Sequence, residues 1–224
     1  MIAIIFMIAL IALSIIPQLW VTGVIKRHAR ERSDFPGTGG EFARHLLDGM
    51  KLHDVKVERT DMGDHYDPDG KAVRLTEAHL NGKSLSAVVI AAHEVGHAMQ
   101  DATGYGPLRA RVAMARKLKW IDTIFPWLMG VSMLLMVLGR SPVLLFIGLG
   151  IGLFLRLIGV VMLMLSLPAE FDASFRRALP VLKAGNYISA RDMGAARHIL
   201  TAAALTYVAA AAMSLINVLR WIRP

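Results

Sequence analysis

Long apolar runs alternate with polar segments along this chain of 224 residues. Each run is close to the length of about 20 apolar residues that a helix needs to cross the hydrocarbon core of a bilayer. The pattern therefore predicts four transmembrane helices, and the RSP turn at 140–142 joins the middle two as a hairpin. The four apolar runs are residues 1–25, 120–139, 143–167 and 199–222.

The first run, residues 1–25, is predicted to be a retained membrane anchor. No basic residue precedes its apolar stretch and no small-residue cleavage pattern follows it, whereas a secretory signal peptide has both features. Buried helices of a soluble protein are the alternative explanation of such runs. Four runs in one short chain, with 55% hydrophobic residues overall, favour a membrane protein.

The charged residues lie almost entirely in two segments, 26–119 and 168–198. The predicted hairpin between them crosses the bilayer twice, so both segments face the same side. Basic clusters at 26–32 and 116–119 flank spans on that side, and such clusters mark the cytoplasmic side of a membrane. We therefore expect both segments in the cytoplasm and both termini outside. A net charge of +8 could also indicate nucleic acid, but its distribution beside the spans argues against that partner.

The polar segment 26–119 has the sequence patterns of a small α+β domain. A capping-box pattern that starts at Thr38 predicts a helix over 39–48. Alternating apolar and polar positions predict a strand over 54–59. Strong turn residues at 67–71, followed by renewed alternation, predict a hairpin.

Two further helices are predicted around the candidate chemistry. Helix-compatible periodicity covers 84–102, where Ser84 or Ser86 can cap the start, and the nearly continuous apolar first half indicates burial. The second polar segment opens with Pro168, which is tolerated in the first turn of a helix. We therefore expect a helix that begins there and covers 168–179.

The stretch HEVGH at residues 93–97 carries the candidate chemistry. Positions four apart share one face of a helix, so His93 and His97 can present their imidazoles to one metal ion. Glu94 is turned about 100° from His93, where it can take a proton from a water activated by that ion. The alternative is a pair of core histidines with a buried glutamate, but burying a carboxylate is costly unless it has a partner or a task.

A catalytic zinc ion usually takes a third protein ligand. The chain has no cysteine, and no histidine follows His97 at a suitable spacing, so a carboxylate must come from elsewhere on the same side of the membrane. The stretch PAEFDAS after the third span offers Glu170 and Asp172. We prefer Glu170 as the ligand and Asp172 as a residue that orients a ligand histidine. The alternative for Glu170 is a surface ion pair with Arg176 or Arg177.

Three separated motifs carry a family resemblance. AAHEVGHAMQDATGY, DHYDPDGKAVRLT and LPAEFDAS closely resemble segments of the bacterial YugP-like membrane zinc metallopeptidases. The resemblance covers most of residues 36–111 and 168–178, with the spans in matching order. It implies one zinc ion per chain held by His93 and His97, Glu94 as the catalytic base, and the bacterial cytoplasmic membrane as the location.

The segment EFDAS also resembles the E-x-x-A-D segment of the CAAX-prenyl and heat-shock membrane metalloproteases. The first Glu of that segment is the third zinc ligand in those enzymes, which implies Glu170 here. Ser174 stands where those relatives carry Asp. Asp172 is therefore the candidate to replace the missing carboxylate beside a ligand histidine.

The HYDP hairpin resembles the edge strand that precedes the metal helix in glutamate-zinc peptidases, where it pairs with an extended substrate. By that analogy residues 60–66 flank the cleft. His65 or Tyr66 would then stabilise the oxyanion. The alternative is a structural turn in which Tyr66 packs inward.

Together these patterns predict a mostly α membrane protein with four transmembrane helices and a small α+β domain of the glutamate-zincin type. The expected function is zinc-dependent hydrolysis of peptides or membrane proteins; a scaffold or quality-control protein with a structural or vestigial zinc site is the non-enzyme alternative. A protease with HEVGH inside the bilayer is a further enzyme alternative, because LLDGM at residues 46–50 resembles part of the distal LDG motif of such enzymes. It is disfavoured because this stretch precedes the metal helix and lies in a polar segment. The predicted parts are an anchor (1–25), a catalytic domain in two pieces (26–119 and 168–198), a transmembrane hairpin (120–167) and a last transmembrane helix (199–224).

Overall fold

The computed structural model describes residues 16, 18–139 and 142–205. The chain divides into two compact units. The unit that we call the polar unit contains Ile16–Arg109 and Ser166–Thr206, and the other, the apolar unit, contains Ala110–Leu165 together with both chain ends. All candidate site residues lie in the polar unit, which is described first.

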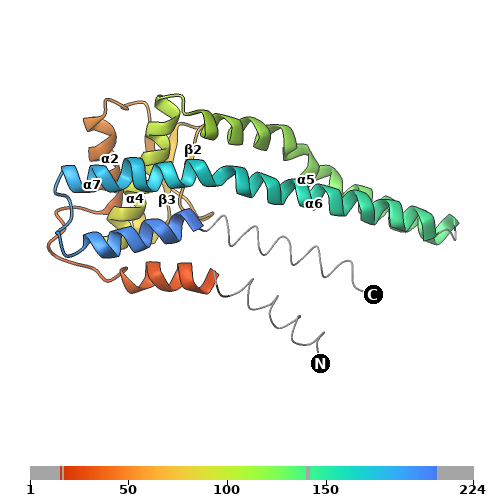
Figure 1. The fold of residues 1–224 in the computed structure, drawn as a ribbon, viewed down its shortest axis with the longest axis horizontal. Helices are drawn as coiled ribbons and strands as arrows, with labels where there is room; N and C mark the ends of the chain where they lie inside the picture. The colour runs from red at the N-terminus through yellow and green to blue at the C-terminus, as the bar shows by residue number, and fades with distance from the viewer. Residues whose placement is uncertain (1–15, 17, 140–141, 206–224) are drawn as a thin grey trace. The chain divides into compact units, whose positions relative to one another are not determined.

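The polar unit is a small sheet surrounded by helices, as expected for an α+β domain (Figure 1). The polar unit contains the helices α2 (Gly39–Gly49), α3 (Glu77–Leu80), α4 (Leu85–Ala102), the π-helix η1 (Asp172–Ala178) and α7 (Leu179–Ala184). The strands are β1 (Lys56–Arg59), β2 (His65–Asp67) and β3 (Ala72–Leu75). Two further helical stretches cover 18–27 and 193–205.

The three strands form one sheet in the order β1-β3-β2. β2 and β3 are antiparallel and form the predicted hairpin. Its turn is held by the side chain of Asp67, whose carboxylate accepts hydrogen bonds from the backbone N–H groups of Asp69 and Gly70 at 2.9 and 3.1 Å. β1 runs parallel to β3 and is shorter than the predicted strand. β2 is therefore left at an edge of this sheet.

The helix that carries the HEVGH stretch is the centre of the polar unit. α4 is buried along nearly its whole length and packs against α2, the sheet and η1. Its predicted start is confirmed, since the hydroxyl of Ser84 accepts a hydrogen bond from the backbone N–H of Ala87 at 3.2 Å. The capping box of α2 is also confirmed: the Thr38 hydroxyl and the Glu41 carboxylate each accept a backbone N–H of the other residue.

The predicted helix start at Pro168 is wrong. α6 (Pro142–Phe171) runs through Pro168 without a break and continues into η1 and α7. Proline removes one backbone hydrogen bond of a helix, and a loss of this kind does not end a helix whose other bonds and packing hold it. The π-helical turn follows directly, and such turns are frequently found at functional sites.

The apolar unit contains most of two long helices, α5 (Gly106–Gly139) and α6. Within the described residues, two helical stretches are long and apolar enough to cross a membrane, Gly106–Gly139 and Phe146–Ala184. Large apolar side chains on them are exposed to the surroundings, for example Trp127 at 75% and Leu138 at 71%. The first and fourth predicted spans fall mostly outside the described residues.

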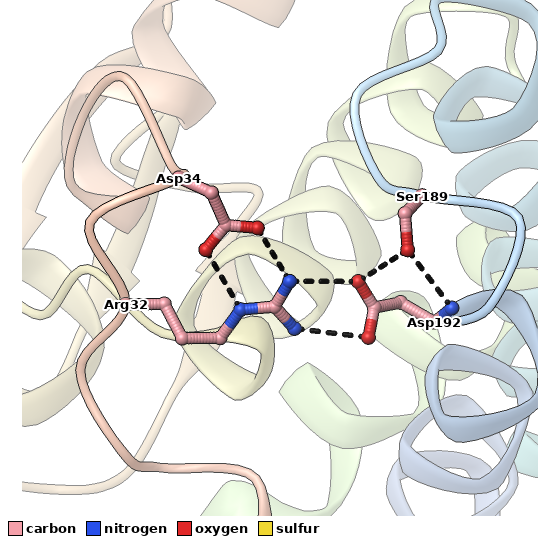
Figure 2. A network of polar contacts seen from close by, with 4 residues as sticks. All are labelled: Arg32, Asp34, Ser189 and Asp192. Atoms are coloured by element: carbon pink, nitrogen blue, oxygen red, sulfur yellow. Dashed lines mark hydrogen bonds and ion pairs between the residues drawn. The ribbon is translucent and has the colours of Figure 1, made fainter.

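An ion-pair network ties the beginning of the polar unit to its end (Figure 2). The guanidinium of Arg32 donates hydrogen bonds to the carboxylates of both Asp34 and Asp192, over distances of 2.5 to 2.9 Å. Asp192 also accepts a hydrogen bond from the Ser189 hydroxyl at 2.7 Å, just before the helix at 193–205. We call these four residues the Arg32 network.

A second network, partly buried, fixes the loop before β2. The Asp64 carboxylate accepts hydrogen bonds from the backbone N–H and the hydroxyl of Thr76 at 2.7 and 3.0 Å, and it contacts Nδ1 of His79 at 2.7 Å. Burial alone would raise the pKa of the Asp64 carboxyl. The hydrogen bonds from His79 and Thr76, together with the charge of His79, hold that pKa below its usual value. The ionised carboxylate is thus favoured in the folded state.

We expect Asp64→Asn to reduce the free energy of unfolding by about 1–3 kcal/mol at pH 7, because buried partners lose a charged acceptor. The wild-type contribution is fully present above the carboxyl's unfolded pKa, about 3.9, and is lost as the pH falls through the lowered folded value. Denaturation measured from pH 7 to pH 3 should therefore show a shallower acid decline in the variant. The exposed Asp61→Asn is the control, and parallel pH profiles for Asp64→Asn and wild type would contradict the prediction.

Candidate metal centre

Three buried side chains converge in the polar unit. His93 and His97 come from one face of α4, and Glu170 comes from the last turn of α6. Their ligand atoms all lie within 4.8 Å of one another. Oε2 of Glu170 is 3.3 Å from Nε2 of His93 and 3.3 Å from Nε2 of His97. The exposed fractions of the three residues are 3%, 5% and 1%, so water is largely excluded from the ligand atoms.

The outer side of the His97 ring is held by a buried amide. Nδ1 of His97 lies 2.9 Å from Oε1 of Gln100. The amide nitrogen of Gln100 donates to the backbone carbonyl of Ala169 at 2.7 Å and to the carboxylate of Asp172 at 2.8 Å. Because both acceptors face the amide nitrogen, the amide oxygen faces the ring, and Nδ1 must carry the hydrogen. In the neutral ring Nε2 of His97 is then the nitrogen with the lone pair, and it lies 3.3 Å from Oε2 of Glu170.

The outer side of the His93 ring is held by a hydroxyl. Oγ of Ser174 lies 3.0 Å from Nδ1 of His93 and donates its hydrogen to the backbone carbonyl of Leu200 at 3.3 Å. A hydroxyl that donates to a carbonyl can accept from the ring, which corresponds to a hydrogen on Nδ1 of His93. In the neutral form of both rings Nε2 is then the nitrogen with the lone pair, which is the form that binds a metal ion.

The donor set fits zinc. Zinc binds imidazole nitrogen and carboxylate oxygen at about 2.0–2.2 Å, most often with tetrahedral geometry. Two such ligand atoms on a tetrahedral ion are separated by about 3.3–3.5 Å. The two separations of 3.3 Å between Glu170 and the histidine nitrogens match this value. The three residues can therefore hold a zinc ion with little movement.

Glu94 follows the first histidine on the same buried helix. It is 6% exposed, in a stretch of α4 whose neighbours are almost all apolar. A carboxylate is costly to place there without a partner or a chemical role. The helical rotation of about 100° per residue turns Glu94 away from the direction of the His93 side chain.

Asp172 acts on a histidine only through another residue. Its carboxylate accepts hydrogen bonds from Gln100 and from Nε of Arg177, at 2.8 and 2.7 Å, and Gln100 in turn holds His97. Asp172 was predicted to orient a ligand histidine, and in the structure it is linked to His97 through Gln100. Arg177, predicted as an alternative partner of Glu170, pairs with Asp172 instead.

The structure does not bring the hairpin residues into the cluster of ligand atoms. The Tyr66 hydroxyl donates a hydrogen bond to Asp101 at 2.7 Å, and Nδ1 of His65 lies 2.8 Å from the backbone carbonyl of Gly63. Burial and the contact with Asp101 raise the pKa of Tyr66, so it remains a neutral donor. Tyr66 packs inward, as in the alternative structural interpretation of this turn.

Sequence reasoning missed Gln100 and did not assign a role to Ser174. One signal was available for each residue. Gln100 is a polar residue three positions after His97 on a helix predicted to be buried, and it is 0% exposed. Ser174 lies four positions after Glu170, which places both on one side of a helical segment. Gln100 is close to His97 in the sequence, whereas Ser174 meets His93 across 81 positions.

A close approach at Gly96 sets the separation of α4 and η1. A Cβ atom added at Gly96 would lie 2.8 Å from the backbone carbonyl oxygen of Ala173, which cannot move without moving η1. η1 carries Ser174 and directly follows Glu170. The glycine between the two histidines therefore allows the third ligand to reach them.

We expect Gly96→Ala to lower the free energy of unfolding by about 1–3 kcal/mol through overpacking and to weaken zinc binding as η1 shifts. Thermal unfolding and zinc titration of the purified protein measure the two effects. Gly49→Ala is the matched control, because a Cβ there meets nothing within 4 Å. Equal behaviour of the two variants would contradict the role of the close approach.

The fold and the site define the class of this protein: a mostly helical protein with a buried two-histidine, one-glutamate centre that can hold a metal ion. The chain belongs to the family described as “Putative neutral zinc metallopeptidase”, which matches residues 3–224. It is 38% identical over 217 residues to “Putative membrane protease YugP” of Bacillus subtilis (strain 168), covering 96% of this chain and 92% of that protein. No solved structure shows significant similarity to the chain.

Proposed function

We propose that this protein is a membrane-embedded zinc endopeptidase in which His93, His97 and Glu170 hold one zinc ion. The observation that carries the proposal is the convergence of three buried side chains that can each supply a ligand atom. Two of them are histidines, which Gln100 and Ser174 hold in the metal-binding form. Membership of a zinc peptidase family supports the same metal and the same reaction class.

The proposed chemistry divides between the ion and Glu94. Zinc supplies Lewis acidity, which polarises a peptide carbonyl and makes water more acidic. Glu94 acts as the general base: its carboxylate takes a proton from the attacking water and later gives that proton to the leaving amine. The buried surroundings of Glu94 strengthen its electrostatic interactions with charge that develops beside it.

An extended peptide is the substrate form that the polar unit suits best. β2 lies at an edge of the sheet and contacts α4, which carries both histidines. An edge strand has unpaired backbone groups that can bind an added strand. We infer that the substrate backbone pairs with β2 and that residues 60–66 flank its path. His65, next to this edge, is the remaining candidate for a contact to the oxyanion.

The proposed location is the bacterial cytoplasmic membrane, with four spans and the polar unit on the cytoplasmic side. The exposed apolar side chains of α5 and α6 suit lipid contact, and the similar Bacillus protein is named a membrane protease. The basic clusters at 26–32 and 116–119 support the cytoplasmic orientation. Substrates that are membrane proteins, or their cytoplasmic tails, would reach such a site directly.

Metal removal tests the proposal. We expect the full chain, purified in detergent, to contain about one zinc ion and to cleave an unstructured peptide library. A chelator should abolish cleavage, and stoichiometric zinc should restore it. Metal analysis and product mapping by mass spectrometry measure the two results. Zinc content without cleavage would favour the scaffold alternative, and cleavage that persists after the metal is removed would refute the proposed chemistry.

A further inference from the structure

An open cavity of about 450 Å³ lies in the polar unit and shares no lining residue with the metal centre. This volume is in the range of small-molecule sites, about 300–1,000 Å³. Its lining is mostly charged and polar, so an apolar ligand does not fit it. The cavity is formed by the segment after the helix at 18–27, the start of α4 and the start of the helix at 193–205.

Three residues of the Arg32 network, which Figure 2 draws, line this cavity: Arg32, Asp34 and Asp192. Arg32 is held between the carboxylates of Asp34 and Asp192, so these three charges are already paired with one another. Arg27 and Arg30 line the same cavity and differ from Arg32 in their ion pairing. Neither guanidinium has a carboxylate within ion-pair distance among residues 16, 18–139 and 142–205, which the structure describes. The cavity therefore offers two guanidinium groups to a ligand.

The carboxylate of Glu31 also lines the cavity, between the two arginines in the sequence. The guanidinium and carboxylate groups of the lining are equal in number: Arg27, Arg30 and Arg32 against Glu31, Asp34 and Asp192. A ligand with only negative charge would meet Glu31 as a like charge. A ligand that carries one phosphate and one ammonium group matches the charges of Arg27, Arg30 and Glu31.

An exposed apolar face leads along the preceding helix to the cavity. Trp20 lies four positions after Ile16, and Arg27 lies eleven positions after it. This spacing places the three residues on one side of a helix. Ile16 is 61% exposed and Trp20 is 44% exposed. Seven residues of helix separate Trp20 from Arg27 by about 10 Å. Tryptophan is enriched at the interface between acyl chains and headgroups, and arginine in the cytoplasmic segments beside it.

We propose that this cavity binds the headgroup of a zwitterionic phospholipid with a primary ammonium, of the phosphatidylethanolamine class. Arg27 and Arg30 bind the phosphate through charge-assisted hydrogen bonds, and Glu31 accepts hydrogen bonds from the ammonium. The acyl chains lie along Ile16 and Trp20. The inference rests on the proposed membrane location and is independent of the proposed peptidase chemistry.

Lipid binding to the full chain, measured by native mass spectrometry in detergent, tests this inference. We expect phosphatidylethanolamine to bind more tightly than phosphatidylglycerol or phosphatidylcholine, since neither of the latter presents a primary ammonium to Glu31. The double variant Arg27→Gln/Arg30→Gln should weaken that binding about tenfold or more. Lys117→Gln/Lys119→Gln removes the same charge from another basic cluster and should leave binding unchanged.

The alternative outcomes are distinct. Equal losses of phosphatidylethanolamine binding in the two double variants would overturn the site. Phosphatidylglycerol that binds as tightly as phosphatidylethanolamine would overturn it as well. Soluble phosphoethanolamine should bind more weakly than the lipid, and equal affinity would overturn the lipid as the source of the headgroup. Zinc content measured on the same samples should stay at the wild-type level, which separates a failure of this inference from a failure of the metal centre.

Discussion

Glu94→Gln is expected to lower kcat for peptide cleavage by at least about 10²–10⁴-fold while the zinc content stays at the wild-type level. Glutamine has nearly the same size and can keep hydrogen bonds, but it cannot accept the proton of the attacking water. Glu94 is 6% exposed, so an isosteric replacement also avoids a cavity in the packed helix. Cleavage of a mapped peptide and metal analysis of the same preparation measure both quantities.

The control for this variant is Glu77→Gln, which neutralises a glutamate with a half-exposed side chain outside the site. It should cleave like wild type. A Glu94→Gln protein that cleaves at the wild-type rate would remove the general-base assignment, whatever its zinc content. Loss of zinc together with activity would instead give Glu94 a role in metal binding or folding of α4.

Local patterns predicted the elements that position the site. The capping box at Thr38, the turn at 67–71 and the cap at Ser84 each depend on residues within a few positions of one another, and the structure contains all three. The approach of Glu170 to the histidines was predicted by a different argument. It followed from the requirement for a third ligand on the same side of the membrane, and the structure brings the carboxylate to 3.3 Å from both rings.

The contacts that fix the histidine rings could not be predicted in the same way. Ser174 meets His93 across 81 sequence positions, and Gln100, three positions after His97, is itself held by Asp172 across 72. Such pairs depend on the separation and rotation of α4 and η1, which the close approach at Gly96 allows. The expected helix start at Pro168 failed for a related reason. Local propensity predicts a boundary there, but the packing of α6 and η1 keeps the helix continuous.

Glu170→Ala is expected to reduce zinc affinity by more than the 10–100-fold typical of losing an outer hydrogen-bond partner of a ligand. The variant removes the only carboxylate of the described three-residue cluster and leaves two histidines, which do not complete a catalytic zinc site. Competition with a zinc chelator of known affinity measures the change, and circular dichroism checks that the helices are retained. Activity should fall with the bound zinc and should return only partly when zinc is added in excess.

Gln100→Leu provides the graded comparison for Glu170→Ala. It keeps the ligand carboxylate but removes the amide that fixes His97, so zinc affinity should fall by about 10–100-fold, less than in Glu170→Ala. Because Gln100 also holds Asp172, a smaller effect is expected for Asp172→Asn, which leaves the amide in place. Unchanged zinc affinity in Glu170→Ala would move the third ligand elsewhere. An equal loss in Gln100→Leu and Glu170→Ala would mean that ring orientation, rather than the carboxylate, determines zinc binding at this centre.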